Sequence, residues 1–138
     1  MEVQKGRYIT IGNIYRSPNS TLADNKELCH EIEGLVDEAK RDIIITGDFN
    51  FPDIDWDIHY STTNSYGRTL FLNTLHKLLL KQHVNFPTRA RGVHTPHLLD
   101  LLITDDQFVH NIDTLALLGK SDHSVLMIQT DMFLVLDR

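Results

Sequence analysis

The sequence predicts an α+β domain in which helices pack on the outside of a mixed sheet. Segments of β type and helical type follow one another in the order β, α, β, α, β, β, β along 138 residues. Three consecutive isoleucines, Ile43 to Ile45, disfavour a helix and fit a strand that is covered on both faces. A chain of this length buries roughly 68% of the surface that its unfolded form exposes, so one hydrophobic core is expected.

The first third of the chain predicts a strand, a turn and a helix. Arg7 to Tyr15 is rich in β-forming residues, and the turn-forming residues Ser17 to Ser20 close it. Thr21 and Asp24 have the spacing of a capping box at a helix N-terminus. The apolar residues of the helix recur at helical spacing and are Leu28, Ile32, Leu35, Val36 and Ala39.

The remainder predicts one more helix and four strands. A strand from Asp42 to Thr46 leads into a polar loop from Phe51 to Tyr66, and a loop of that length is usually functional or flexible. A helix is expected from Gly67 to Lys81, with inward-facing residues at Phe71, Leu75, Leu78 and Leu79. The last three strands are expected at Leu98 to Thr104, Ile112 to Leu118 and Ser124 to Thr130, with an extension into Met132 to Leu136.

The composition indicates an intracellular protein, nuclear or cytoplasmic, without a membrane span. No apolar run approaches the ~18 residues that a span needs, and the N-terminus lacks the apolar region of a secretory signal. Cys29 is the only cysteine, so an internal disulfide and a cysteine-based zinc site are excluded.

The charges are segregated along the chain, although the net charge is -6. Residues 58 to 99 contain no Asp or Glu, and their basic residues are Arg68, Lys77, Lys81, Arg89 and Arg91. Such a segment can form a face that meets phosphates, for which Arg89 and Arg91 are the better bidentate candidates. The alternative is that Lys77 and Lys81 only solvate the outer surface of a helix.

Polar residues stand where predicted strands begin or end. Asp48 and Asn50 follow Gly47 after the isoleucine strand, at a position where open α/β sheets bind cations or phosphates. Asp100 interrupts an apolar run and therefore needs a partner, for which a histidine is well suited. Asp122 and His123 directly precede another apolar strand.

Four ordered motifs resemble the endonuclease/exonuclease/phosphatase superfamily. They are Tyr15-Arg16-Ser17-Pro18-Asn19, Gly47 to Trp56, Leu99-Asp100-Leu101 and Gly119-Lys120-Ser121-Asp122-His123, and Thr88-Arg89 adds a weaker fifth. The resemblance is closest to the endonuclease domain that accompanies reverse transcriptase in non-LTR retrotransposons. It implies a deoxyribonuclease-I-like four-layer α/β sandwich and hydrolysis of phosphodiesters with Mg²⁺, or with Mn²⁺ as an alternative. DNA is the first expectation for the bound nucleic acid.

The resemblance also implies a role for each matching residue. Asp48 would orient or deprotonate water, His123 would stabilise the phosphoryl oxygens, and Asp100 would orient His123. Tyr15 would donate a hydrogen bond to the phosphate, which Asn50 would hold. The implied metal ligands are Asp48, Asn50 and Asp122, and the implied substrate-binding residues are Asn19, Arg89 and Arg91.

The chain departs from the superfamily pattern at its N-terminus. Only 14 residues precede Tyr15, and Glu2 does not match the glutamate motif that supplies a principal magnesium ligand in the superfamily. Residues 1–138 are therefore expected to form a partial domain without the N-terminal metal-ligand motifs. An incomplete sandwich leaves apolar surface and a strand edge open, so self-association, a missing N-terminal segment in another chain, or marginal stability is expected.

Two alternatives remain open at this point. The chain is either an enzyme or a catalytically inactive remnant that serves as a binding or interaction module. The run Asp53 to Asp57 also resembles the start of a calcium loop, but Ile58 stands where glycine is needed and Asn64 where glutamate is needed.

Overall fold

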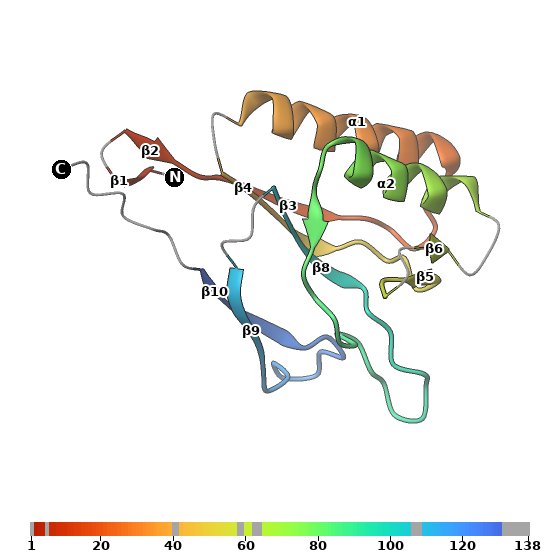
Figure 1. The fold of residues 1–138 in the computed structure, drawn as a ribbon. Helices are drawn as coiled ribbons and strands as arrows, with labels where there is room; N and C mark the ends of the chain where they lie inside the picture. The colour runs from red at the N-terminus through yellow and green to blue at the C-terminus, as the bar shows by residue number, and fades with distance from the viewer. Residues whose placement is uncertain are drawn as a thin grey trace.

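A four-stranded mixed sheet forms the centre of the protein (Figure 1). The computed structural model describes residues 2–4, 6–39, 42–57, 60–61, 65–105 and 109–130. In sheet order the strands are β3 (Thr10–Tyr15), β4 (Ile43–Asp48), β8 (Asp100–Thr104) and β7 (Lys81–Gln82). β3 and β4 are parallel and the other neighbours are antiparallel, which confirms the predicted mixed sheet.

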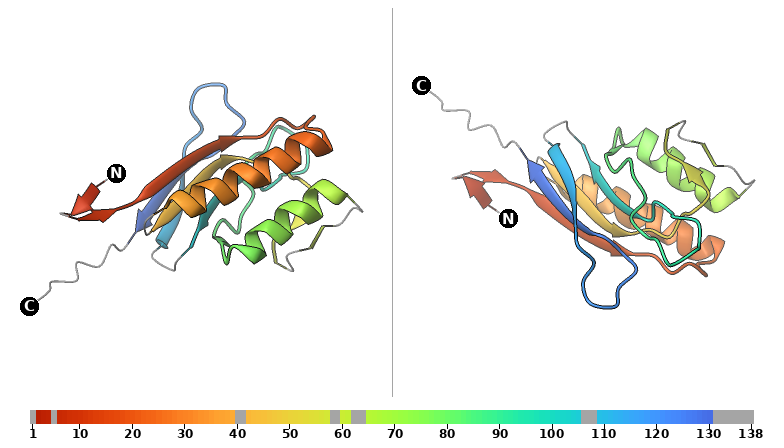
Figure 2. Two further views of the ribbon diagram at one scale, coloured as in Figure 1. Left: turned by 90° about the horizontal axis from the view of Figure 1, so that it is seen from above. Right: turned by 90° about the horizontal axis from the view of Figure 1, so that it is seen from below.

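Both helices cover the same face of this sheet (Figures 1 and 2). Helix α1 (Leu22–Glu38) begins at the predicted capping box, with Thr21 and Asp24 bonded reciprocally. Helix α2 (Tyr66–Lys77) lies beside α1. The core between helices and sheet includes Ile32, Ile43, Ile45, Phe49, Phe71, Leu75, Leu101 and Ile103. Ile43 and Ile45 are thus buried on the helix side, whereas Ile44 on the other face is only partly buried, so the predicted cover is complete on one face.

A second, two-stranded sheet lies on the opposite face of the central sheet (Figures 1 and 2). It consists of β9 (Val109–Leu115) and β10 (Val125–Thr130), paired antiparallel. The described residues therefore form three layers, which are helices, central sheet and second sheet. The predicted extension to residue 136 falls outside the described residues.

Two short hairpins complete the described structure. β1 (Glu2–Gln4) pairs with β2 (Arg7–Tyr8), so the predicted strand from Arg7 to Tyr15 is interrupted at Ile9. β5 (Ile54–Asp55) pairs with β6 (Tyr60–Ser61) inside the predicted long loop. None of the helices in the described part of the chain is long and apolar enough to cross a membrane.

Helix α2 ends earlier than the sequence predicts, and the prediction that Leu79 faces inward is wrong. The amide of Leu79 bonds to the His76 carbonyl, and the amide of Leu80 bonds to the Leu75 carbonyl. These two bonds, with Leu79 at a φ of 56°, form a Schellman C-cap, which usually has glycine at that position. Leu79 is consequently 82% exposed.

The register of the central sheet places three predicted site residues in one row. Tyr15 pairs with Asp48 across β3 and β4, and Asp48 pairs with Asp100 across β4 and β8. Paired residues point to the same face of a sheet, and Ile43 and Ile45 place the odd-numbered positions of β4 on the helix side. The row of Tyr15, Asp48 and Asp100 therefore lies on the face opposite the helices.

Candidate active site

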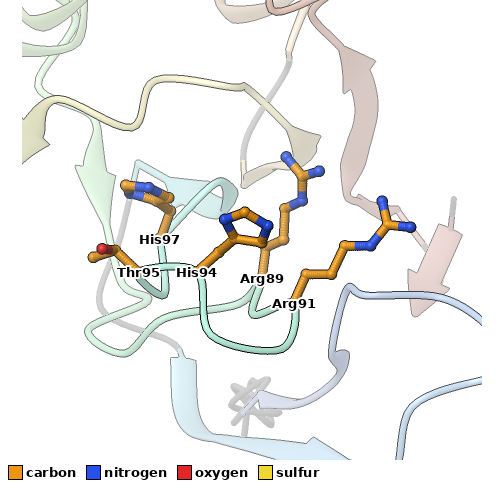
Figure 3. Close-up of a pocket in the computed structure, with 5 residues that line it drawn as sticks. All are labelled: Arg89, Arg91, His94, Thr95 and His97. Carbon is orange, nitrogen blue, oxygen red and sulfur yellow. The ribbon is translucent and has the colours of Figure 1, made fainter.

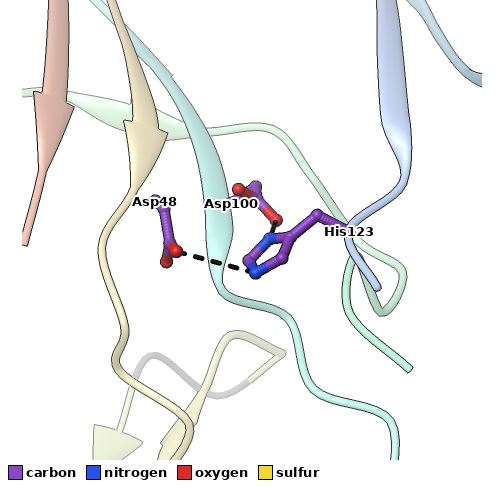
Figure 4. A group of neighbouring side chains, drawn as sticks. All are labelled: Asp48, Asp100 and His123. Carbon is purple, nitrogen blue, oxygen red and sulfur yellow. Dashed lines mark hydrogen bonds and ion pairs between the residues drawn. The ribbon is translucent and has the colours of Figure 1, made fainter. Parts of the chain in front are cut away.

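Asp48, Asp100 and His123 come together at the end of β4 (Figure 4). His123 Nδ1 lies 2.9 Å from Asp100 Oδ2, and His123 Nε2 lies 3.8 Å from Asp48 Oδ2. All three side chains are partly buried. The imidazole thus bridges two carboxylates, and the partner predicted for Asp100 is His123.

Burial and the neighbouring charge set the protonation of Asp48. Burial raises the pKa of the Asp48 carboxyl, and the charge of Asp100 raises it further. His123 and hydrogen bonds from Asn50 act in the opposite direction. The net shift of this pKa is upward, which makes Asp48 a better proton acceptor than an exposed aspartate.

Asn50 is held beside Asp48 by the backbone of its own loop. Its amide donates to Asp48 Oδ1 over 3.1 Å, and its side-chain Nδ2 donates to the Arg16 carbonyl over 2.7 Å. The residue is buried and has a φ of 47°, in the left-handed region that asparagine tolerates. The predicted proximity of Asp48 and Asn50 is therefore present, with the Asn50 NH₂ group bonded to the end of β3.

Arg16 is a supporting residue that the sequence analysis quoted in a motif but did not assign to the site. The Arg16 Nη1 atom donates to the Asn50 carbonyl over 2.9 Å, and the Arg16 Nε atom donates to Asn25 Oδ1 over 2.7 Å. The guanidinium also lies 4.0 Å from the centre of the Phe51 ring. Arg16 thereby joins β3, α1 and the loop after β4. The long-range partners of an arginine are not visible in sequence spacing.

Gly47 allows the strand that carries Asp48 to approach β3 closely. Its φ is 144°, and a Cβ built there would lie 1.8 Å from the Ile14 carbonyl oxygen. Only glycine fits such an approach. The glycine at position 47 is thus required by the close approach of β4 to β3.

Thr88 connects the strand of Asp100 to the segment of His123. The Thr88 hydroxyl accepts hydrogen bonds from the amides of Leu99 and Asp100, over 3.1 and 3.0 Å. The Thr88 carbonyl accepts from the Ser124 amide over 2.7 Å. Because Thr88 is buried, it fixes both members of the Asp100–His123 pair. The sequence analysis noted Thr88 only as part of a weak motif.

Asp122 points to Arg89 in this structure. Its Oδ2 lies 3.0 Å from Arg89 Nε, and the hydrogen bond from Arg89 is the largest cause of the lowered pKa of the Asp122 carboxyl. Among the described residues, the possible metal ligands whose atoms lie within 4.8 Å of one another are Asp48, Asp100 and His123. Asp122 does not belong to this group. Asp122 is thus adjacent to the cluster in sequence, and its side chain forms an ion pair at the edge of the site.

Arg89 and Arg91 line a basic pocket of about 430 Å³ (Figure 3). The other lining residues are His94, Thr95 and His97. The loop closes on itself because the Arg89 amide and carbonyl both bond to the backbone of His97. Arg89 also lies opposite His123, where the flanking backbone bonds run from the Ala90 amide to the Asp122 carbonyl and from the Ser124 amide to the Thr88 carbonyl. The acid-free segment therefore presents its cationic side chains next to the segment that carries His123.

The remaining predicted residues lie at the end of β3. Tyr15 is 73% exposed and belongs to the row with Asp48. Asn19 is exposed in the following turn, where its amide donates to Ser17 Oγ. The structure therefore places Tyr15 in the site and Asn19 in an accessible turn that begins two residues beyond β3.

The donor set at the cluster fits a divalent cation. Asp48 and Asp100 provide carboxylate oxygens and His123 provides a ring nitrogen, within 4.8 Å of one another. Carboxylate oxygens suit Mg²⁺ and Mn²⁺, whereas the imidazole nitrogen is a ligand typical of softer transition metals. Burial is the main cause of the raised pKa of Asp48, and the charge of Asp100 adds to it; a bound cation would offset both effects.

Two sheets packed face to face, with helices outside and an Asp–His–Asp cluster at the strand ends, define a deoxyribonuclease-I-like endonuclease fold. The chain belongs to the endonuclease–reverse transcriptase family, whose sequence model matches residues 9–127. The family resemblance expected from the four motifs is thereby confirmed. No curated protein matches the chain.

A solved structure similar to this chain is the endonuclease domain of TRAS1, a telomere-specific non-LTR retrotransposon. The two share 16% sequence identity with a TM-score of 0.65, which establishes a common fold. The match covers 84% of this chain and 52% of the other. This chain therefore spans about half the length of the structure that it matches.

Proposed function

We propose that this protein hydrolyses phosphodiester bonds in nucleic acid, as a metal-dependent endonuclease of the retrotransposon type. The observation that carries this proposal is the Asp48–His123–Asp100 cluster at the ends of β4 and β8. DNA is the proposed substrate, and the proposed location is intracellular, in the nucleus or cytoplasm.

Asp48 and His123 divide the proposed chemistry. Asp48, whose pKa is raised by burial, accepts a proton from the attacking water or orients it. His123 Nε2 faces the same space, and Asp100 holds Nδ1 over 2.9 Å, which fixes the orientation of the ring so that Nε2 can stabilise charge on the phosphoryl oxygens. Tyr15, next in the row, donates a hydrogen bond to the phosphate.

Mg²⁺ is the proposed cofactor, with Mn²⁺ as an alternative. The residues that the family resemblance proposes to hold it are Asp48, Asn50 and Asp122, of which Asp48 and Asn50 are bonded to each other. The described donor cluster offers Asp100 and His123 beside Asp48 as the alternative ligands. When bound, the cation would neutralise the charge that develops on the phosphate. For Asp122 to take part, its carboxylate would have to exchange Arg89 for the cation.

The basic pocket is proposed to hold the nucleic-acid backbone beside the reacting phosphate. Arg91, His94 and His97 line it together with Arg89, whose backbone bridges to His123. Guanidinium groups bind phosphate oxygens in bidentate fashion. Asn19, which is exposed in the turn after β3, is proposed to contact the nucleic-acid backbone as well.

A second candidate function is a binding module without turnover. The chain covers 52% of the structure that it matches, so the endonuclease domain of that protein has a large part with no counterpart here. A binding module of this kind would have the same fold and the same basic pocket, but it would hydrolyse nucleic acid no faster than the uncatalysed background.

A plasmid-nicking assay separates the two functions. The chain is compared with Asp48→Ala and His123→Ala in Mg²⁺, in Mn²⁺ and in EDTA, and the surface variants Glu38→Ala and His76→Ala are the matched controls. Hydrolysis predicts metal-dependent nicking by the chain and both controls, and a loss of about 10²- to 10⁴-fold in the two site variants. Equal background rates for all five proteins would exclude the enzyme, and a duplex-binding measurement with Arg91→Ala would then test the binding module.

A further inference from the structure

The ion pair between Arg89 and Asp122 joins the two binding regions of the candidate active site. Arg89 lines the basic pocket, and Asp122 directly precedes His123, which belongs to the cluster with Asp48 and Asp100. The Arg89 Nε atom donates to Asp122 Oδ2 over 3.0 Å. A guanidinium proposed to bind phosphate and a carboxylate proposed to bind the cation are therefore each other's partners in this structure.

This ion pair is weak enough to exchange its partners. The two side chains are 42% and 27% exposed, and ion pairs in contact with water contribute little to stability because water and salt screen them. The hydrogen bond uses the Nε atom of Arg89. Among the described residues, no hydrogen bond holds the two terminal nitrogen atoms of this guanidinium, which extends from the loop (Figure 3). A phosphate can therefore reach Arg89 before the carboxylate is displaced.

The backbone around Asp122 is fixed, so an exchange of partners requires rotation of side chains only. The Asp122 carbonyl accepts from the Ala90 amide over 3.1 Å, and the Ser124 amide donates to the Thr88 carbonyl over 2.7 Å. The pKa of the Asp122 carboxyl is lowered mainly by the hydrogen bond from the guanidinium, and the charge of His123 lowers it further. The carboxylate thus lies within electrostatic reach of the cluster, and rotation about its own χ angles can redirect it.

Asp122 is the carboxylate that competes with phosphate for the basic pocket. The pocket belongs to the segment from residue 58 to 99, which contains no Asp or Glu. Arg91 lines the same pocket, and within the described part of the chain it forms no ion pair. Of the two arginines, Arg89 alone is therefore neutralised by a carboxylate, and Arg91 serves as its matched control.

We propose that the Arg89–Asp122 ion pair is a switch that couples the binding of nucleic acid to the binding of the cation. This inference rests on the proposed function, from which it takes its two ligands. A backbone phosphate that binds Arg89 releases Asp122, whose carboxylate then turns to the cation. A cation that binds Asp122 releases Arg89 for phosphate in the same way. Because both ligands break the same ion pair, the second ligand does not have to break it again, and the two bind cooperatively.

The strength of the ion pair sets the size of this coupling. A ligand binds more weakly by the fraction of molecules in which its binding group is free. A partly exposed ion pair lowers that fraction about two- to fivefold. Direct contact between cation and phosphate would also make their binding cooperative, but it would not change the affinity of either ligand alone. The tests therefore use one ligand at a time.

The first test measures the affinity of the full chain for Mn²⁺ by titration calorimetry, without nucleic acid. Arg89→Met keeps the aliphatic stem and removes the guanidinium, so it releases Asp122 and should tighten Mn²⁺ binding about two- to fivefold. The same substitution should have no such effect in the Asp122→Asn background. Arg91→Met removes a charge from the same pocket without breaking an ion pair, and at about 0.15 M salt it should change the Mn²⁺ affinity less than about 1.5-fold.

The second test measures binding of a fluorescent DNA duplex in EDTA, where no cation takes part. Asp122→Asn releases Arg89 and should tighten duplex binding about two- to fivefold, and this gain should vanish in the Arg89→Met background.

Two outcomes would overturn the switch. They are additive effects of the two substitutions in either test, and the absence of saturable Mn²⁺ binding by the parent and all variants. Neither test records hydrolysis, so the two proposals fail separately. Plasmid nicking with additive effects rejects the switch alone, whereas non-additive effects without nicking support the switch and reject the proposed hydrolysis.

Discussion

At the scale of single residues, the site depends on Asp48 being held in an environment that disfavours its charge. Burial and Asp100 raise the pKa of the Asp48 carboxyl, against the opposing effects of His123 and Asn50. The folded protein therefore binds a proton more readily at Asp48 than the unfolded chain does. Stability from this residue is present at low pH and is lost as the pH rises through the two pKa values.

Asp48→Asn is accordingly expected to stabilise the metal-free protein at pH 7 and to abolish nicking. The amide keeps an acceptor for the Asn50 N–H, which donates over 3.1 Å, and removes the buried charge. Denaturant unfolding in EDTA at pH 7 and pH 3 measures the effect, with Asp57→Asn in an exposed turn as the control for charge alone. The expectation is contradicted if Asp48→Asn has a lower free energy of unfolding than the parent at pH 7 and the same difference is found at pH 3. The charge of Asp48 would then not be destabilising.

Much of the site can be predicted from the sequence, because short motifs identify residues by their own type and their immediate neighbours in the chain. Asp48, Asp100 and His123 were each expected from their positions at strand ends, and the structure brings them together. Arg16 and Thr88 were not assigned to the site, because their importance comes from partners 34 and 12 residues away, at Asn50 and Asp100. Asp122 still awaits its test as a metal ligand, since it pairs with Arg89 here.

At the scale of elements, the segment before β8 connects the central sheet to the second sheet. The Thr88 hydroxyl accepts from two amides at the start of β8, and the Thr88 carbonyl accepts from Ser124 just before β10. The backbone of Ala90 adds a bond to the Asp122 carbonyl. The mutual position of Asp100 and His123 therefore depends on one buried threonine.

Thr88→Val is expected to destabilise the protein by about 2–4 kcal/mol, because it leaves the buried amide of Leu99 and the partly buried amide of Asp100 without this acceptor. The valine has nearly the same shape, so the loss reports hydrogen bonding and not packing. Thr88→Ser keeps the hydroxyl and should lose much less. The comparison is made by denaturant unfolding, and equal stabilities of the valine and serine variants would contradict this role of the hydroxyl.

Element boundaries were predicted less well than element types. The α2 helix stops at Lys77 because the chain adopts a Schellman cap with Leu79 in the left-handed region. Glycine usually occupies that position, so a leucine there does not predict the end of a helix. The hairpin of β5 and β6 lies in the predicted loop, and two-residue strands are too short to show an alternating pattern. The longer elements were predicted correctly, because α1 has an apolar periodicity and β4 has a run of isoleucines.

At the scale of the whole molecule, the two sheets differ in how well they are buried. Four of the five residues of β8 are buried, whereas no described side chain of β9 or β10 is fully buried. A two-stranded sheet is at best marginally stable by itself, so β9 and β10 depend on the segment that carries Thr88 and Ala90. Marginal stability and self-association both remain expectations for this chain, and light scattering together with thermal unfolding tests them.

The second sheet should therefore open before the central sheet does. Amides of Ile112 and Ile128, which face each other across β9 and β10, should exchange with an opening free energy at least about 2 kcal/mol below that of Ile45 and Ile103 in the core. Native-state hydrogen exchange measures both sets in one sample, and light scattering checks that the sample is monomeric. Because His123 lies two residues before β10, this opening would also separate His123 from Asp48 and limit the fraction of molecules with an assembled site. Identical opening free energies in both sheets would instead indicate one cooperative unit, in which the second sheet is stabilised by the core as strongly as β8.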